Sequence, residues 1–587
     1  MPASTFQTLP PPIIDLVLRY LLRLPTEIHS FPLFKIQTSH AEISPLYHTC
    51  QAWRTAALSL MFARCTAVLG ETVSFTFNLN ECNPRITNCL DSHLTPYVKT
   101  ISASIDCNST ANGSVLAQLE RTFYMLKFVN AYSLVLEVRV GDSRPTGGLE
   151  LSGIAERTLE HIKNMMPPLN HLWLSLKDEA PHSDGAQYRQ LRALMQGVAK
   201  MPLSLYLELD HPCQPYIVES CVPAGNLTKL TCVWSEQCAP LACIIRSNLN
   251  SLLELHIAYA SFAQVERLVV DEHGNPAVYP HLTTLVLSDR GAVPTHCPPQ
   301  LELAAPFPRL RVFQSHIKYP FGDDVVFRGN SSSLENIYIM GDFKIIKMLS
   351  GCGVFAKGRL RSLHKLVVAD SVMEIDNVDA VIDTYMGVIG NVLPGLTELR
   401  AVDADISDAI IALLTSKCSG LRPSPPKYEN LQLLSLYRSF LTLTDMVRLL
   451  QSLPHLRTLG NRVSGLGNDF RNTNSSALGI AEIMRSQFNP LNHFFKRWRI
   501  TNTTHFPENF VIASILLLAD VCPGLETIIF DFKSNDAVEQ LFKKMVGSKL
   551  YANCQGRLSV SLNNSYRKPA MHIRHTSCGP DVGTLCV

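Results

Sequence analysis

The C-terminal tail holds the residues of this chain that are best suited to bind a metal ion. His572, His575 and Cys578 are spaced three residues apart, and Cys554 and Cys586 lie outside them. Structural zinc is held by closely spaced pairs of ligands at both ends of a loop, and only one such end is present here. We therefore expect an unliganded tail and no bound metal.

The sequence carries no strong catalytic or cofactor-binding signature. Gly351-Cys-Gly353-Val-Phe-Ala356 matches the glycine pattern of dinucleotide-binding loops, but Lys357-Gly358-Arg359 follows where a helix should run. Phosphate-binding GxxxxGK[ST], zinc-protease HExxH and esterase GxSxG motifs do not occur in the sequence. We therefore expect a non-enzyme without cofactors, and a hydrolase with scattered catalytic residues is the remaining enzymatic alternative.

The run Phe494-Phe495-Lys496-Arg497-Trp498-Arg499 mixes aromatic and cationic residues, as surfaces that bind single-stranded nucleic acid do. It is an isolated cluster in a chain whose formal net charge is only +2. A nucleic-acid surface needs a field of positive charge, which this composition does not supply. We expect a solvated face with aromatic packing or a local partner contact, and no nucleic acid.

Composition and cysteine usage favour an intracellular protein with extensive buried surface. Charged residues make up 17% of the 587 residues, against about 25% in soluble domains, so many elements must be buried on several sides. The 17 cysteines are scattered without a CxxC pair, which favours reduced thiols over a disulfide scaffold. No signal peptide and no apolar run long enough for a membrane span are visible. We expect a cytoplasmic or nuclear location and no membrane partner.

The elements that must position any site are repeats of the form Leu-x-x-aliphatic-x-apolar. Leu285 and Leu287, for example, follow Leu282 at this spacing. Copies begin at Leu169, Leu227, Leu252, Leu282, Leu334, Leu363, Leu396, Leu431, Leu456 and Leu525, with a degenerate copy at Leu310. Between Leu227 and Leu456 the steps range from 24 residues, between Leu310 and Leu334, to 35 residues, between Leu396 and Leu431.

This spacing is close to that of leucine-rich repeats, whose period is about 20 to 29 residues. The last residues of each copy alternate as in a strand with one buried face, and helical periodicity precedes several copies, as in 445–450 and 512–521. We therefore predict an α/β solenoid, with a curved parallel sheet and outer helices. The asparagine or cysteine that usually ends such a repeat is missing, so we expect unequal repeats.

The first 62 residues differ from the repeats and predict a small all-α module. Thr8 can cap a helix that begins with prolines, and Ile14, Val17, Leu18 and Leu21 would form its apolar side. A second helix is expected from Ser44-Pro45 onward. Its apolar side would comprise Leu46, Cys50, Trp53, Ala57, Leu60 and Met61.

This module resembles an F-box. The shared features are Leu9-Pro10, the aliphatic pair Ile13-Ile14, and a later helix that carries Leu46, Cys50 and Trp53-Arg54. With its repeats, the chain resembles fungal F-box/leucine-rich-repeat proteins. The resemblance implies that the module docks on the adaptor of a cullin–RING ubiquitin ligase. The adaptor-binding residues would be Leu9, Pro10, Ile14, Leu18, Leu46, Cys50 and Trp53.

The predicted organisation has four parts. An F-box-like helical module spans 5–62, divergent first repeats or a connecting segment span 63–165, the solenoid spans 166–550, and a cap or tail spans 551–587. On the F-box resemblance, the expected function is that of a non-catalytic substrate-recognition subunit of a Skp–cullin–F-box type ubiquitin ligase, whose repeats hold a target protein. The alternative is a leucine-rich-repeat scaffold without a ligase link, whose N-terminal helices only cap the solenoid.

Overall fold

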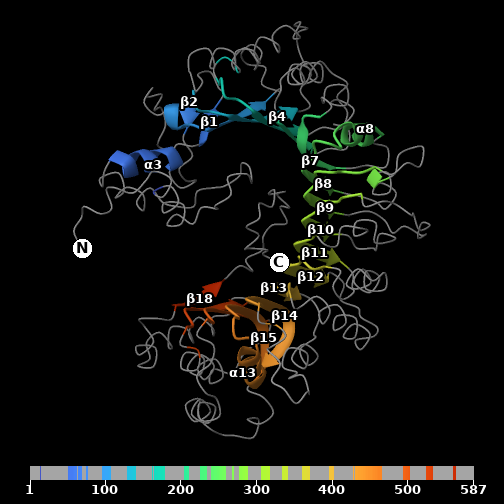
Figure 1. The fold of residues 1–587 in the computed structure, drawn as a ribbon. Helices are drawn as coiled ribbons and strands as arrows, with labels where there is room; N and C mark the ends of the chain where they lie inside the picture. Colours follow the sequence, from blue (N-terminus) through green and yellow to red (C-terminus); the bar gives the residue numbers. More distant parts are fainter. Residues whose placement is uncertain are drawn as a thin grey trace. The chain divides into compact units, whose positions relative to one another are not determined.

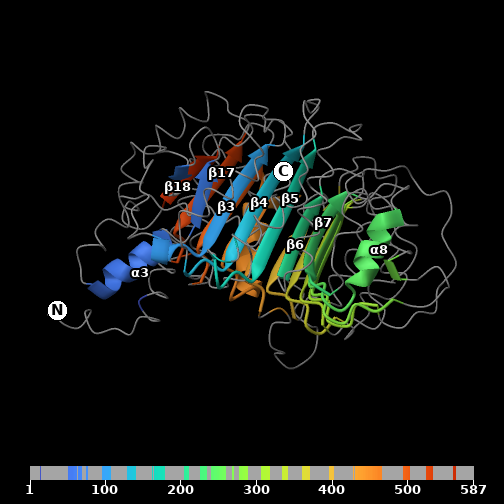
Figure 2. The same ribbon diagram turned by 90° about the horizontal axis from the view of Figure 1, so that it is seen from above.

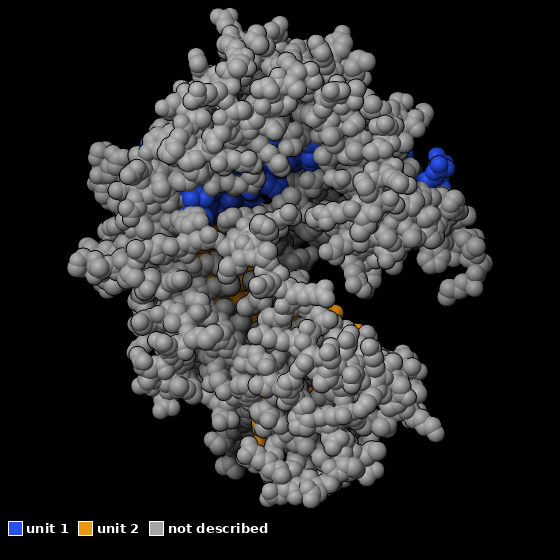
Figure 3. Space-filling model, turned by 180° about the vertical axis from the view of Figure 1, so that it is seen from behind, with its two compact units in different colours: residues 1–259, 573–587 blue, residues 260–572 orange. Residues whose placement is uncertain are grey.

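The computed structural model describes the repeated core of the chain and leaves many connecting segments undescribed. The described residues are 14, 51–61, 64–68, 74–76, 95–106, 129–140, 162, 164, 166–178, 204–209, 225–233, 239–258, 268–269, 277–288, 306–316, 333–341, 360–370, 395–401, 428, 430–465, 494–502, 522, 524–532 and 559–563. The chain divides into two compact units, unit 1 with residues 1–259 and 573–587, and unit 2 with residues 260–572 (Figure 3).

Unit 1 contains a parallel sheet in which neighbouring strands follow chain order (Figure 2). Strands β1, β3, β4, β5, β6, β7 and β8 pair in parallel in this order, and β2 pairs antiparallel with β1. The elements are α3 (Gln51–Met61), β1 (Arg64–Val68), β2 (Ser74–Thr76), η3 (Thr95–Tyr97), β3 (Thr100–Asp106), β4 (Ser133–Val140), β5 (His171–Asp178), β6 (Ser204–Leu209), β7 (Leu227–Val233), α8 (Ala239–Ser247) and β8 (Glu254–Ala258).

Unit 2 continues the same principle, since each strand from β9 to β18 pairs in parallel with the next (Figure 1). Its elements are β9 (Thr284–Ser288), β10 (Val312–His316), β11 (Asn336–Gly341), β12 (Lys365–Asp370), β13 (Glu398–Ala401), β14 (Leu433–Thr442), α13 (Leu443–Ser452), β15 (Thr458–Gly465), β16 (Arg497–Asn502), β17 (Thr527–Phe532) and β18 (Ser559–Asn563). Parallel strands at repeat spacing make each unit a solenoid-like α/β structure, as the sequence predicts.

The leucines of the repeat form continuous rows across unit 2. Leu285, Phe313, Ile337, Leu366, Leu399, Leu434 and Leu459 are register partners on successive strands. Each of them is at most 4% exposed. Leu285, Ile337, Leu366, Leu399 and Leu434 therefore stack on the buried side of one parallel sheet, as the alternating pattern of the repeats predicts.

One hydrogen-bond pattern recurs in the turns that contain the first leucine of each repeat. In the turns of unit 2, the carbonyl that follows the first leucine accepts two backbone N–H groups from the next repeat. The Thr283 carbonyl accepts from Arg311 and Val312 at 2.9 Å each, and the Arg311 carbonyl accepts from Glu335 and Asn336 at 2.8 and 3.0 Å. Each of these carbonyls directly follows a buried first residue of a repeat, and its hydrogen bonds join that repeat to the next one.

Several strands lack the Leu-x-x-Leu pattern because a residue other than leucine occupies its first position. Val98 and Ala131, both fully buried, stand there before β3 and β4, and the sequence has Pro202 before β6 and Arg557 before β18. The range 63–165 therefore contains β1, β3 and β4 in register with β5. Beyond residue 550, where the period is lost in the sequence, β18 extends the sheet by one more strand.

The run Phe494–Arg499 belongs to one of these divergent repeats. Phe495 takes the first leucine position and Trp498 the second, and both are fully buried. The isolated cluster in the sequence therefore leads into strand β16, and its residues Phe495 and Trp498 are part of the core. Phe494 alone among its aromatic residues is exposed, at 49%.

The described helices follow the expected apolar spacing. In α13, Met446, Leu449 and Leu450 are buried, and Asp445 lies in the first turn, where the helix dipole favours an acid. The helical pattern predicted for 445–450 is therefore confirmed, whereas 512–521 lies outside the described residues. In α8, Leu241, Ile244 and Ile245 are buried in the same way.

Candidate functional site

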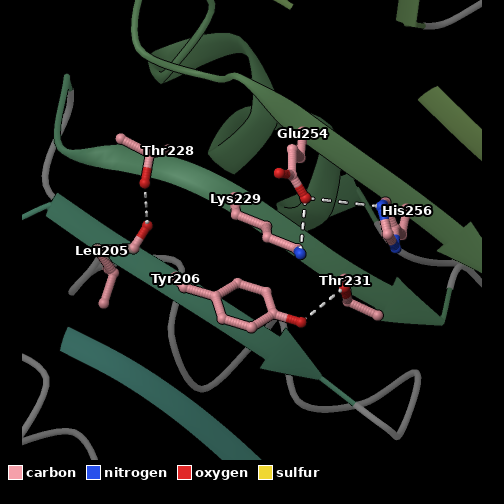
Figure 4. Close-up of polar contacts among 7 residues, drawn as sticks. All are labelled: Leu205, Tyr206, Thr228, Lys229, Thr231, Glu254 and His256. Carbon is pink, nitrogen blue, oxygen red and sulfur yellow. Dashed lines mark hydrogen bonds and ion pairs between the residues drawn. The ribbon is translucent and has the colours of Figure 1, made fainter. Parts of the chain in front are cut away.

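The side of each sheet that carries the residues between the buried leucines is the best candidate for a functional surface. Alternate side chains of a strand point to opposite sides. In unit 1 this places Tyr206, Lys229, Thr231, Glu254 and His256 together on one side of β6, β7 and β8 (Figure 4). We call this side of either sheet its polar face.

The polar face of unit 1 has a connected row of aromatic and charged groups. The rings of Trp173 and Tyr206 lie with centroids 4.2 Å apart, tilted by 49°. The Lys229 ammonium lies 4.9 Å from the centroid of the Tyr206 ring and 2.6 Å from the Glu254 carboxylate. The row therefore combines ring packing, a cation–π contact and an ion pair on neighbouring strands. Such linked side chains are held in place before any partner arrives.

A local bulge adjusts the register of this row. Leu205 pairs with Leu227, but Tyr206 pairs with Lys229, so Thr228 is the extra residue in β7. The Thr228 hydroxyl donates to the Leu205 carbonyl at 3.1 Å, which satisfies a backbone group that the bulge displaces (Figure 4). The shift places Lys229 directly beside Tyr206, where the cation–π contact forms.

His256, the register partner of Thr231 on the polar face, is a neutral imidazole. Burial, together with the nearby Lys229 ammonium, lowers the pKa of His256 from 6.5 to about 4, against the opposing effect of Glu254. Its Nε2 atom lies 4.0 Å from the Glu254 carboxylate, too far for a hydrogen bond. At neutral pH this residue therefore adds a polar group without charge to the face.

Three buried polar atoms on this face lack a hydrogen-bond partner within the described part of the chain. They are Trp173 Nε1, Ser175 Oγ and His256 Nε2. Trp173 and Ser175 are two residues apart on β5, so both side chains lie on the same side. Buried polar groups are nearly always paired, so these unpaired atoms on β5 and β8 mark positions where water or a ligand group could form a hydrogen bond.

Unit 2 has a related arrangement on its own polar face. The Lys365 ammonium lies 5.2 Å from the Tyr338 ring centroid and 3.0 Å from the Glu398 carboxylate. Glu398 also accepts from Arg400 Nε at 2.6 Å. A tyrosine, a lysine and a glutamate on three successive strands thus occur in each unit, and unit 2 adds an arginine.

A shallow pocket lies in unit 2 at the edge where β14, β15 and β16 begin. It is lined by Asn430, Gln432, His455, Arg457 and Phe494. The rings of His455 and Phe494 lie 5.4 Å apart. The lining brings hydrogen-bonding groups and one exposed aromatic side chain together, without a nucleophile–base pair that would indicate catalysis.

The adaptor-binding residues expected from the F-box resemblance are only partly described. Ile14 is helical and fully buried, and Trp53 lies in α3 with 7% exposure. Both side chains are therefore buried in the free chain. The other expected anchors, Leu9, Pro10, Leu18, Leu46 and Cys50, lie outside the described residues. Adaptor contact through any of these residues stays a prediction.

The remaining chemical candidates fall outside the described residues. These are the tail residues His572, His575 and Cys578 with Cys554 and Cys586, and the glycine pattern 351–356. Within the described ranges, no group of three or more His, Cys, Asp or Glu residues could hold a metal ion. No helix in these ranges is long and apolar enough to cross a membrane.

Sequence reasoning missed the polar face of unit 1 because it followed the leucines. Tyr206 belongs to a repeat that begins with Pro202, and its only signal is the alternation of Leu205, Leu207 and Leu209. The residues between them could have been assigned to the polar face from that alternation. A comparison with protein-family models and with curated proteins found no match for this chain.

Proposed function

We propose that this chain is a non-catalytic binding protein that holds a partner protein on the polar face of its repeat sheets. The observation that carries this proposal is the row Trp173–Tyr206–Lys229–Glu254, whose side chains are fixed to one another across neighbouring strands. A surface that is ordered before binding loses little side-chain entropy when a partner arrives. The unpaired atoms of Trp173, Ser175 and His256 would gain hydrogen-bond partners at the same time.

We further propose that the bound protein is the substrate of a cullin–RING ubiquitin ligase. This step is supported by the F-box resemblance of residues 5–62 and by the helical, buried state of Trp53 within that range. In such an assembly the N-terminal module docks on the ligase adaptor and the ligase partners supply the ubiquitin chemistry. The chain itself then needs only two binding surfaces.

Partner binding to the polar face can be tested with a matched pair of charge reversals. Glu254 on the polar face and Glu335 in a turn are both ion-paired, and their side chains are 32% and 31% exposed. Affinity purification should recover the same partner proteins with the wild type and with Glu335→Lys, and lose them with Glu254→Lys. Circular dichroism must show that both variants are folded. Equal recovery with all three proteins would contradict binding at this face.

The scaffold alternative is favoured by one specific observation. Ile14 and Trp53 are already buried in the free chain, so they can serve as a cap core without any adaptor. Hydrogen exchange of α3 in the full-length protein separates the two functions. If the module docks, a purified fungal cullin–RING adaptor should slow exchange across Gln51–Met61. Unchanged exchange at saturating adaptor would reject the ligase function and leave the scaffold.

A further inference from the structure

The polar face of unit 2 has one row in which two arginines flank two small residues. Arg400, Ser435, Gly460 and Arg499 are register partners on β13, β14, β15 and β16. Direct partners on neighbouring strands lie on the same side of a sheet. Strands are about 4.8 Å apart, so the two arginine backbones are separated by about 14 Å, with little side-chain bulk between them.

Ser435 marks the middle of this row as an incomplete site. Its side chain is buried, with 4% of the residue exposed, and its Oγ atom has no hydrogen-bond partner within the described residues. Gly460, the next member of the row, has no side chain that could supply one. A buried hydroxyl without a partner costs free energy, and a ligand acceptor above Ser435 would remove that cost.

The charges around the row are mostly positive. Among the described side chains of the polar face of β12 to β16, the cations are Lys365, Arg400, Arg497 and Arg499, and the anion is Glu398. Glu398 is shared between Lys365 at 3.0 Å and Arg400 at 2.6 Å. Its contact with Arg400 engages Nε, so the terminal nitrogens of that guanidinium can still donate to another acceptor.

We propose that this row binds an acidic segment of the partner protein, with one carboxylate seated above Ser435 and Gly460 between Arg400 and Arg499. The Ser435 hydroxyl donates to that carboxylate, and the guanidinium groups supply charge-assisted hydrogen bonds from both sides. This inference rests on the proposed function, because it requires that a partner protein lies on the polar face. It adds the chemistry of the segment that is recognised.

The test uses the full-length protein and a fluorescein-labelled peptide of ten glutamates, which is long enough to cross these four strands. Fluorescence anisotropy should show binding that weakens with salt. Arg400→Gln and Arg499→Gln should each weaken binding about tenfold, and Ser435→Ala, which removes only the hydroxyl, about threefold. Arg448→Gln, which removes a half-exposed cation from helix α13, should leave binding unchanged.

Four results would overturn the inference, provided that circular dichroism shows folded proteins. They are no peptide binding by the wild type, unchanged binding by Arg400→Gln and Arg499→Gln, an equal loss with Arg448→Gln, or tighter binding of a ten-residue thymidine oligonucleotide that is lost in the same arginine variants. A result that rejects the acidic segment can be distinguished from a result that rejects partner binding. Partner proteins that are lost with Glu254→Lys but retained with Arg400→Gln would preserve the binding protein and reject the acidic segment.

Discussion

The buried hydrogen bond between Asn461 and Trp498 provides a sharp test of how the repeats are held together. Asn461 stands on β15 where the repeat expects an apolar residue, and its Oδ1 atom accepts from the Trp498 indole at 2.9 Å. Both residues are fully buried. A repeat consensus would favour Asn461→Leu as a stabilising change. The structure predicts the opposite, because the indole N–H would lose its acceptor in the core.

The magnitude follows from the burial of the two partners. A buried donor without a partner costs about 1 to 3 kcal/mol, and complete burial with good geometry favours a value near 2 kcal/mol. The extra apolar surface of leucine works against this loss in Asn461→Leu, whereas Trp498→Phe adds the cost of a smaller ring in the core. A double-mutant cycle cancels both contributions to first order. We expect the two changes together to destabilise less than their sum by about 2 kcal/mol.

Native-state hydrogen exchange read by mass spectrometry gives the local free energies, because a long repeat array need not unfold in a single step. Peptides that cover β15 and β16 should exchange about 30-fold faster in Asn461→Leu if the full 2 kcal/mol appears as local opening. Peptides of unit 1 serve as the internal control. A coupling below about 0.5 kcal/mol would refute the reasoning, since distant sites are additive within that range.

Three further predictions concern other parts of the two units. Leu366→Ala should lower the local free energy of unfolding by about 2 to 5 kcal/mol in hydrogen exchange of peptides from β11 to β13, because Leu366 is fully buried in the central leucine row; a loss below about 1 kcal/mol would argue against that row. Since the pKa of His256 is lowered to about 4, only the unfolded chain takes up this proton between pH 6.5 and 4. Stability should therefore fall by up to about 3 kcal/mol as the pH drops through that range, and His256→Gln should abolish this part of the loss. Finally, a thiol-alkylating reagent should label exposed Cys243 well before Cys522, whose burial raises its pKa to about 12, as peptide mapping would show; equal labelling in the folded protein would contradict this.

The sequence predicts the parallel sheets well because burial constrains the leucine positions so strongly. Leu285, Leu366 and Leu434 must all face one core, and a leucine pattern that recurs every 24 to 35 residues leaves few other folds. Repeats whose first residue is not leucine were harder to find. Phe495 and Val98 fill the same place in the turn as leucine does, since the turn requires apolar volume there and tolerates several side chains.

The candidate site was less predictable because its contacts depend on register. The sequence indicates that Lys229 and Glu254 lie between apolar residues, but not that the extra residue Thr228 aligns Lys229 with Tyr206. A register shift of one residue would have moved every later side chain of β7 to the other side. Similarly, the sequence gives no reason for Asn461 at an apolar position of its repeat, because its partner Trp498 lies 37 residues later.

The two sides of each sheet are under different physical constraints. The buried side must supply apolar volume, and leucine recurs there, as at Leu230, Leu255 and Leu399. On the polar face, a lysine over a tyrosine and beside a glutamate recurs in both units. The tyrosine is the direct register partner of the lysine in unit 1, whereas in unit 2 Asn336 takes that place and Tyr338 lies two residues further along β11.

The recurring lysine–glutamate pair neutralises itself, so the charge of each polar face is set by the residues around it. Among the residues that the structure describes on that face of β12 to β16, the further cations are Arg400, Arg497 and Arg499. Changing Arg400 or Arg499 should therefore alter which partner binds and leave the leucine rows that determine the fold in place. If the two sides were instead coupled, an arginine substitution would loosen the repeats as much as a leucine substitution does, and hydrogen exchange across β13 to β16 would detect it.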